Sequence, residues 1–277
     1  MTHITVPAKT FLLGEYAALS GGSAIILTTT PCFRIDCTDD GLLKGIHRDS
    51  PAGRYWTQHA PVTQGLCFND PYVGQGGLGA SSAQFLGAYQ LLHPEALDRE
   101  ALLTTYIKYA WHGDGVKPSG YDLLAQAEKG CVYINRQKNI IQSYPWPFDD
   151  IAFLLVHTGN KLATHEHLQS LTTDCNHDAL SIMVDEAQTA CLRQDSDTFT
   201  QLITRYQQAL MAKGLSTEPT QQLLAHFLKK PAILAAKGCG ALGADVILLI
   251  VRPVMRAALC EQLAAEGFRL LPGRSPI

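Results

Sequence analysis

The pattern of apolar positions divides the first half of the chain into short strands and helices. Runs of β-branched and other apolar residues predict strands over residues 4–6, 11–13, 23–30, 33–37 and 131–134. Apolar residues at helical spacing predict helices over about 81–92 and 98–110, the second with Asp98 as N-cap, and a short helix beginning near Tyr121. Residues 39–72 are rich in Gly, Pro and Asp, which predicts loops and short strands there.

The second half repeats this alternation after a change of composition. Two prolines and two acidic residues within 144–150 mark the best candidate for a domain boundary. Beyond it the pattern predicts a strand over 151–157, helices over 176–213 and 218–229, a glycine-containing turn over 237–244, a strand over 246–251, a helix over 255–266 and a strand over 268–271. Strands followed by helices in both halves predict an α+β fold of two domains, 1–150 and 151–277, with a ligand between them.

Composition and charge exclude several classes of protein. The chain is 46% hydrophobic and 17% charged, which is typical of a folded globular protein. Its formal net charge is −3 without a basic cluster, so we expect no nucleic-acid partner. The longest apolar run, 246–251, is too short for a membrane span, so we expect no membrane partner. The N-terminus has no signal pattern and none of the 8 cysteines forms Cys-x-x-Cys, which favours a reduced, cytoplasmic protein.

The most informative segment is residues 74–82, which read Gly-Gln-Gly-Gly-Leu-Gly-Ala-Ser-Ser and precede an apolar stretch. Glycine lets the backbone approach an anion closely, and a helix beginning at the serines would direct its unpaired N–H groups at that anion. The spacing of Gly74, Gly76 and Gly79 also fits a dinucleotide fingerprint, but Pro71 interrupts the strand that should precede it. The Gly-Lys-Ser/Thr ending of a Walker loop is absent. A glycine turn without a ligand stays open on this segment alone.

Three other segments change that picture. Residues 7–19 read Pro-Ala-Lys-Thr-Phe-Leu-Leu-Gly-Glu-Tyr-Ala-Ala-Leu, 118–122 read Pro-Ser-Gly-Tyr-Asp, and 237–245 read Lys-Gly-Cys-Gly-Ala-Leu-Gly-Ala-Asp. Together with the glycine loop, and in this order, they resemble the motifs of the GHMP small-molecule kinases and span most of the chain. The resemblance implies an N-terminal ribosomal-S5-like α/β domain and a C-terminal ferredoxin-like domain. It also implies ATP- and Mg²⁺-dependent phosphoryl transfer to a small molecule.

Within this family the chain is most similar to the kinases of the mevalonate pathway. The segment His-Thr-Gly-Asn-Lys-Leu-Ala-Thr at 157–164, the Gly-Glu-Tyr at 14–16 and the ending Gly-Ala-Asp at 243–245 are nearer to phosphomevalonate kinases than to mevalonate kinases, which stay as the alternative. Mevalonate kinases carry a Mg²⁺-binding glutamate before the aspartate loop, and the matching position here is Lys108. Either Ser81 with ATP and water holds the metal, or Asp114 substitutes for the glutamate, or the chain is not a mevalonate kinase.

The resemblance implies a role for each candidate residue. The glycine loop would hold the phosphates of ATP, with the hydroxyl of Ser81 on Mg²⁺, through Gly74, Gly76, Gly77, Leu78, Gly79, Ala80, Ser81 and Ser82. Asp122 would accept the proton of the attacking oxygen or orient that oxygen, and Lys9 would lie near Asp122 and the γ-phosphate. Contacts to the acceptor are expected from Glu15, Tyr16, Ser119, Gly120, Thr158, Gly240 and Ala241.

These residues also have simpler interpretations. Asp122 could be a helix N-cap, Lys9 a solvated surface lysine and Thr158 a strand-end hydroxyl. The run His-Glu-His at 165–167 is not a metal motif, because residues two apart on a helix diverge. For the whole chain the rivals are a nucleotide-binding regulator without catalysis and a dinucleotide-dependent oxidoreductase. A small-molecule substrate is the expected partner, and a homodimer stays open.

Overall fold

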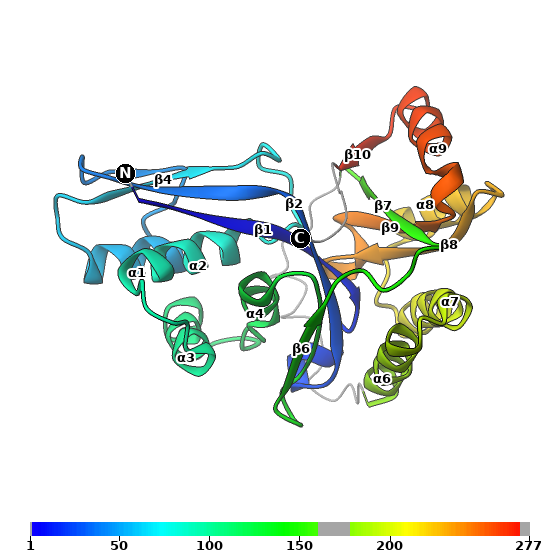
Figure 1. The fold of residues 1–277 in the computed structure, drawn as a ribbon, viewed down its shortest axis with the longest axis horizontal. Coiled ribbons are helices and arrows are strands. Elements are labelled where there is room, and N and C mark those ends of the chain that lie inside the picture. Colours follow the sequence, from blue (N-terminus) through cyan, green and yellow to red (C-terminus); the bar gives the residue numbers. More distant parts are fainter. Residues whose placement is uncertain (1, 160–177, 272–277) are drawn as a thin grey trace.

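The computed structural model describes residues 2–159 and 178–271, which form two β-sheets with helices on them. Figure 1 shows the first sheet with α1–α4 on the left and the second sheet with α6–α9 on the right. The mixed α+β architecture predicted from the sequence is confirmed. Thr164, the run 165–167 and Cys175, on which the sequence analysis commented, lie outside the described residues.

The first sheet is built around one long strand. Its six strands are β1 (His3–Leu13), β2 (Ala24–Thr38), β3 (Leu43–Lys44), β4 (Gly65–Asn69), β5 (Cys131–Asn135) and β6 (Ile140–Tyr144). Five of them lie in the order β3-β4-β2-β5-β6. The sixth strand, β1, lies outside this order and pairs with β2. The strands predicted over 4–6 and 11–13 are parts of β1, because Ala8, Lys9 and Thr10 between them also pair with β2.

Helices α1 (Pro51–His59), α2 (Ala80–Leu92), α3 (Arg99–Ala110) and α4 (Tyr121–Glu128) cover this sheet, and a 3₁₀ turn, η1 (Ala17–Ser20), follows β1. The predictions for α2, α3 and α4 are confirmed, and Asp98 caps α3 by accepting from the N–H groups of Glu100 and Ala101. The prediction of loops and short strands across 39–72 is wrong where α1 lies. The N-cap Ser50 followed by Pro51 is the start signal that the Gly-rich composition obscured.

The second sheet has a ferredoxin-like topology, as the resemblance implied. Its elements are β7 (Ala152–His157), α6 (Asp178–Arg193), α7 (Ser196–Ala212), α8 (Glu218–Leu228), β8 (Ile233–Cys239), η2 (Ala241–Gly243), β9 (Val246–Val251), α9 (Pro253–Ala265) and β10 (Arg269–Leu271). All neighbours in the order β10-β7-β9-β8 are antiparallel. With helices after the first and third strands, this is the β-α-β-β-α-β arrangement.

Two predicted elements of this half differ from the structure. The helix predicted over 176–213 is two helices, because Asp195 accepts from the N–H of Thr198 and begins α7 anew. The turn predicted from Lys237 begins later, since β8 continues to Cys239.

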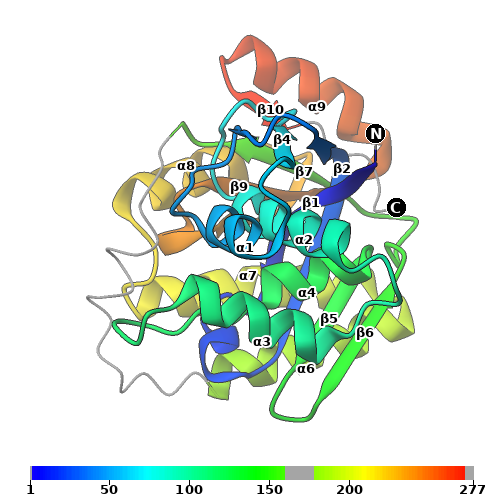
Figure 2. The same cartoon turned by 90° about the vertical axis from the view of Figure 1, so that its left-hand side faces the viewer.

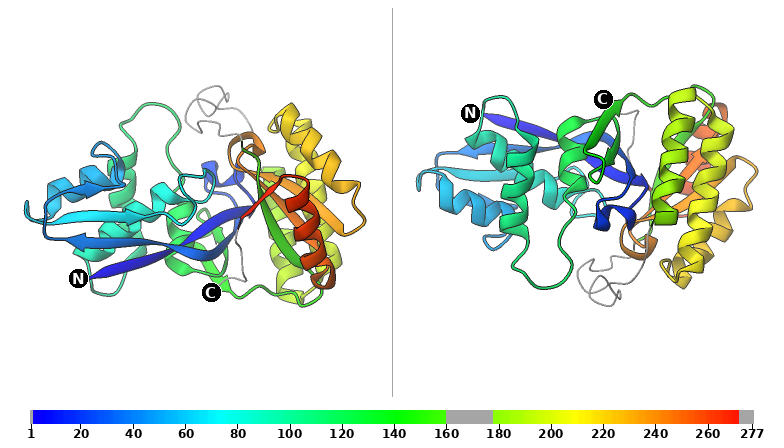
Figure 3. Two further views of the ribbon diagram at one scale, coloured as in Figure 1. Left: turned by 90° about the horizontal axis from the view of Figure 1, so that it is seen from above. Right: turned by 90° about the horizontal axis from the view of Figure 1, so that it is seen from below.

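Both faces of the second sheet are covered by helices. Successive residues of a strand point to opposite faces, so Leu248 packs in the core beneath α6 and α7 while Leu249 packs against α8 and α9. This explains why β9 reads Val-Ile-Leu-Leu-Ile-Val, without a polar position. Figure 3 shows α6 and α7 side by side on one face of this sheet.

The main hydrophobic core runs through both halves of the chain. It joins Ile25 and Phe85 of the first half to Leu180 and Phe199 of the second. Helix α6 also contacts the first sheet, where Asp185 accepts hydrogen bonds from the hydroxyls of Ser23 and Tyr133. The boundary proposed at residue 150 falls between β6 and β7, yet apolar packing continues across it.

Among the helices that the structure describes, none combines the length and apolar character needed to cross a bilayer. The 7 cysteines in the described ranges are all free thiols.

Gly14 provides a test of how tightly β1 and β2 approach each other. Its φ is +100°, and a Cβ there would lie 2.4 Å from Cα of Ala24. We expect Gly14→Ala to lower the free energy of unfolding by about 3 kcal/mol, from overpacking and left-handed strain. Gly214→Ala is the control, because its φ is +69° but no atom lies within 4 Å. It should cost only about 1 kcal/mol in urea denaturation; equal losses would contradict the packing argument.

Candidate active site

Strand β1 brings the first motif against the other three. The glycine loop leads into α2, the segment 118–122 leads into α4, and the third glycine motif covers the end of β8 and η2. The helices α2 and α4 both pack on β1, and the 3₁₀ turn η2 follows the strand that contacts it. Four segments that are far apart in the sequence therefore meet around one strand.

The glycine loop ends in an open helix N-terminus. Gly79 is the N-cap of α2, with φ +81°, and among the residues that the structure describes no side chain caps this end. The first N–H groups of a helix have no partner within the helix and carry its positive end, so they suit an anion. Earlier in the loop, Gly74 donates its N–H to Asp70 and has open space around its Cα. The geometry is that expected of a phosphate cradle.

Lys9 joins this loop to Asp122. Its backbone N–H donates to the carbonyl of Leu78 at 3.0 Å, and its Nζ lies 3.0 Å from Oδ2 of Asp122. A Cβ at Gly79 would lie 2.7 Å from Cγ of Lys9, so the glycine leaves room for the lysine stem. The Lys9 side chain is 9% exposed, which rules out the interpretation as a solvated surface lysine.

Asp122 lies in the first turn of α4 but does not cap the helix. The N-cap is Gly120, whose φ is +73° and where a Cβ would lie 2.1 Å from Cδ1 of Leu103. Asp122 is the second helical residue and is 37% exposed, so its free oxygen can reach a ligand. Burial raises the pKa of Tyr106 to about 12, and the neighbouring Asp122 carboxylate adds to the rise. Ser119 accepts from the N–H of Tyr121 with its hydroxyl and shapes this turn.

The two serines of the loop differ in their surroundings. Ser82 is buried and donates its hydroxyl to the carbonyl of Gly79 at 3.0 Å. Ser81 is exposed at the same helix end. No cluster of three or more His, Cys, Asp or Glu side chains occurs in the described ranges. A cation here would therefore depend on the exposed hydroxyl of Ser81 and on oxygens of the ligand, which are hard donors of the kind that Mg²⁺ prefers.

Gln126 is a site residue that the sequence analysis missed. It lies one turn after Asp122 on the same face of α4. Its Nε2 donates to the carbonyls of Pro7 and Gly79, at 2.8 and 3.1 Å. It therefore braces β1 against the N-cap of α2. Its position four residues after Asp122, on the same face of the helix, was the feature of the sequence that could have identified it.

The third glycine motif touches the phosphate loop through Asp245. This residue is 5% exposed, and Cβ atoms at Gly77 and Gly240 would lie 2.7 Å from its Cβ and 2.3 Å from its Oδ2. Thr158 donates its hydroxyl to the carbonyl of Asp245 at 3.2 Å. Ala241 begins η2 beside Gly240. Gly77 and Gly240 must therefore be glycines, because a side chain at either position would clash with Asp245.

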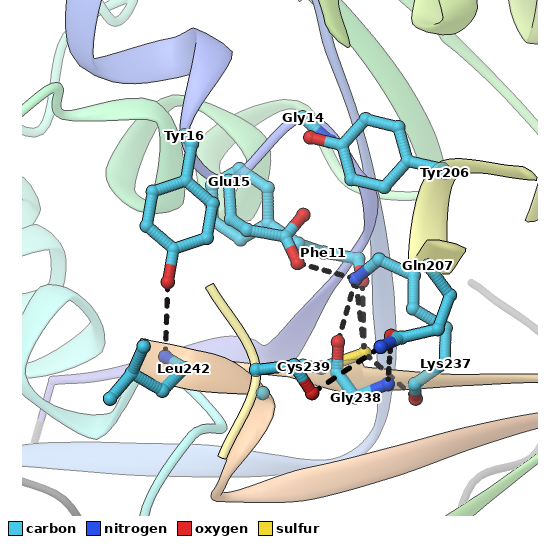
Figure 4. A network of polar contacts seen from close by, with 12 residues as sticks. Phe11, Gly14, Glu15, Tyr16, Tyr206, Gln207, Lys237, Gly238, Cys239 and Leu242 are labelled. Carbon is cyan, nitrogen blue, oxygen red and sulfur yellow. Dashed lines mark hydrogen bonds and ion pairs between the residues drawn. The ribbon is translucent and has the colours of Figure 1, made fainter. Parts of the chain in front are cut away.

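Glu15 lies in a buried ion pair with Lys237, which Figure 4 shows. The two charged atoms are 2.5 Å apart, and the side chains are 9% and 0% exposed. Lys237 also donates to the carbonyl of Gly238, and its ammonium lies 5.8 Å from the ring centre of Tyr206. Glu15 is thus held by the protein itself.

Burial alone would lower the pKa of Lys237, but this pKa is raised, because Cys239 and Glu15 favour the charged ammonium. Burial also raises the pKa of Cys239, which keeps that thiol neutral, so Glu15 is the anionic partner. The second carboxylate oxygen of Glu15 has no hydrogen bond to the described residues and is shielded from solvent.

Two tyrosines complete this network. The hydroxyl of Tyr206 accepts from the N–H of Gly14 at 3.0 Å, and that of Tyr16 accepts from the N–H of Leu242 at 3.1 Å. Leu242 has φ +52°, so Tyr16 supports a strained turn. The side chains of Glu15 and Tyr16 thus connect the first motif, to which they belong, with the third motif. Both side chains point into the protein.

Comparison with known proteins identifies the fold. No protein-family model matches the chain, and no curated protein does. A Streptococcus pneumoniae phosphomevalonate kinase in complex with phosphomevalonate and AMPPNP matches at a TM-score of 0.78 and 16% identity, covering 99% of this chain and 100% of that one. An L. major mevalonate kinase in complex with R-mevalonate matches at 0.75 and 19%, covering 100% and 96%. A Lactococcus lactis galactokinase matches at 0.70 and 12%, covering 99% and 94%. The chain has the fold of the GHMP kinases.

The Glu15–Lys237 pair generates a prediction about stability. Lys237→Met should lower the free energy of unfolding by about 3–5 kcal/mol, because it leaves a buried carboxylate without its partner. Glu15→Leu combined with Lys237→Met should recover most of that loss in urea denaturation. The control is Lys230→Met, which breaks the 2.6 Å pair with Glu266 on the surface and should cost less than about 1 kcal/mol. A double variant no more stable than Lys237→Met would contradict this account.

Proposed function

We propose that this chain is an ATP-dependent small-molecule kinase that transfers the γ-phosphoryl group to phosphomevalonate, giving diphosphomevalonate. Mevalonate is the alternative acceptor. The kinase assignment is supported by the fold, which it shares with enzymes that act on both compounds. It is also supported by the candidate site, where the residues expected for phosphoryl transfer lie together.

The observation that carries the proposal is the position of Lys9. Its ammonium lies against Asp122 while its stem and backbone contact the N-cap turn of α2, so one residue links a carboxylate to a phosphate cradle. In phosphoryl transfer an oxygen of the acceptor bonds to the γ-phosphorus as the bond to ADP breaks. Asp122 would orient that oxygen or take its proton, and Lys9 would offset the charge on the transferred group.

Ser81 and the first turn of α2 would hold the remaining phosphate charge. The open N–H groups after Gly79 suit the β- and γ-phosphates, and the exposed hydroxyl of Ser81 suits Mg²⁺. When bound, Mg²⁺ would neutralise phosphate charge and fix its orientation. The sequence aligns Lys108 with a metal-binding glutamate of mevalonate kinases, but its side chain lines a hollow between α1 and α3, so this position does not help to choose between the two acceptors.

The contacts to the acceptor are proposed from the residues around Asp122 and the third motif. Ser119, Gly120 and Thr158 lie on segments adjoining the site, as do Gly240 and Ala241. Glu15 and Tyr16 would affect the acceptor indirectly, because they hold the third motif in place. The ending Gly-Ala-Asp and the Tyr16 of Gly-Glu-Tyr are the sequence features that favour phosphomevalonate over mevalonate.

The structure weighs against the two rival functions. A dinucleotide fold places its glycine loop after a strand of a parallel sheet, whereas β4 pairs antiparallel with the long strand β2 and parallel only with the two-residue strand β3. A regulator that has lost catalysis has no need for the ion pair between Lys9 and Asp122. Both rivals predict no ATP-dependent product with either acceptor.

The test is a coupled ADP-release assay with phosphomevalonate and, separately, with mevalonate. We expect turnover with phosphomevalonate and a loss of at least about a hundredfold in Asp122→Asn, with ATP binding retained. Glu100→Gln is the matched control, because Glu100 occupies the same helical position in α3 and is exposed. Turnover only with mevalonate would select the alternative. Binding of ATP without turnover on either compound would overturn both acceptors and leave another small-molecule acceptor of the same kinase class, or a regulator without catalysis.

The two loop serines give an independent prediction. Ser81→Ala should lower kcat/KM for Mg²⁺-ATP about tenfold or more, because it removes the hydroxyl proposed as a metal ligand. Ser82→Ala should change kcat/KM less and lower the melting temperature slightly, since its hydroxyl bonds only to Gly79 among the described residues. A Mg²⁺ titration of each variant measures the difference. The reverse ranking would show that Ser82 is the ligand.

A further inference from the structure

A basic cavity of about 480 Å³ lies between α1 and α3. Its walls include Arg48 just before α1 and Arg54 in the first turn of α1, together with Lys108 in the last turn of α3 and His112 just after it. Figure 2 shows these two helices toward the viewer, on the outer side of the helical layer. Asp49 is the acidic residue of the lining, and it lies 3.9 Å from His47.

The basic side chains of this cavity have no carboxylate partner in the described part of the chain. Within residues 2–159 and 178–271, Arg48, Arg54 and Lys108 form no ion pair with a carboxylate. Three permanent cations around one hollow repel one another, and an anion placed among them would remove that repulsion. The chain as a whole has a net charge of −3, so this concentration of positive charge is local.

The cavity walls are held in place by hydrogen bonds. The guanidinium of Arg54 donates to the carbonyl of Tyr109 and contacts His112, which ties α1 to the end of α3. The hydroxyl of Tyr109 donates to Gln58 at 2.6 Å. Nε of Arg54 is shielded from solvent and has no acceptor in the described part of the chain. The walls are therefore preorganised, which lowers the cost of binding.

The cavity is separate from the candidate active site. The Tyr106 ring packs on Phe85 of α2, and a Cβ at Gly120 would lie 3.9 Å from it, beside the aspartate loop. Lys108 follows two residues later, and residues two apart on a helix point in different directions. The side chain of Lys108 thus points away from Asp122, and none of the residues that line the cavity belongs to the candidate active site.

We propose that this cavity is a second binding site, for a small molecule that carries a phosphate or diphosphate group. Guanidinium groups match phosphate oxygens in geometry, and several cations together favour a multiply charged anion over a carboxylate. The volume suits a phosphorylated metabolite, and Thr57 and Gln58 on the same wall can bind its hydroxyl groups. The confinement of the positive charge to one hollow disfavours a nucleic acid.

The experiment is a calorimetric titration with inorganic pyrophosphate, in metal-free buffer, on protein already saturated with a non-hydrolysable ATP analogue. The analogue occupies the phosphate loop, and the comparison of the variants below assigns the remaining heat to the cavity. Arg48→Gln combined with Lys108→Gln should weaken pyrophosphate binding at least tenfold. Lys213→Gln combined with Lys229→Gln removes the same charge from exposed ends of α7 and α8 and should change the affinity less than twofold.

Two outcomes would overturn the proposal. The first is pyrophosphate affinity that is absent in the parent protein or equal in both double variants. The second is an equal loss of affinity for the ATP analogue in the Arg48 and Lys108 variant, which would assign the cavity to the nucleotide's own phosphates. A protein that binds pyrophosphate here but shows no kinase activity would leave this site standing while removing the proposed function, so the two failures are distinguishable.

Discussion

The arrangement of this molecule depends on the ion pair between Glu15 and Lys237, residues 222 positions apart in the sequence. A fully buried ammonium requires a carboxylate partner, so β8 must approach the loop after β1 at the distance that the pair sets. Around that contact the Tyr206 hydroxyl accepts a hydrogen bond from the N–H of Gly14, and the Tyr16 hydroxyl accepts one from the N–H of Leu242. The first and third motifs are therefore held by side chains that belong to the opposite motif or to α7.

A second constraint acts on the phosphate loop. Gly77 and Gly79 must lack side chains because Asp245 and Lys9 occupy the space beside them. With its amide oxygen turned toward β10, Gln75 also accepts from Arg269 at 2.7 Å. The loop is thus shaped from three directions, by β1, by the third motif and by an edge strand of the second sheet. Its glycines reflect close packing as much as affinity for an anion.

Much of this could be predicted from the sequence, for physical reasons. The helices α2 and α3 and the strand β9 have clear periodicity or a clear cap, and the fold class follows from their order. Helix α1 was missed because its composition resembles a loop, although Ser50 and Pro51 mark its start. Lys9 and Asp122 were found through motifs. Gln126 and Lys237 were not assigned roles, because their partners are brought near only by the tertiary fold.

The continuous core has a consequence for how such chains could be recombined. Because Ile25 and Phe85 share one apolar cluster with Leu180 and Phe199, the two halves are not interchangeable modules. A chimera that joined either half to the counterpart from another kinase would have to match that surface, and would also have to supply a carboxylate for Lys237. Exchange between relatives at residue 150 is thus constrained by packing deep in the molecule, and the two sheets must change together.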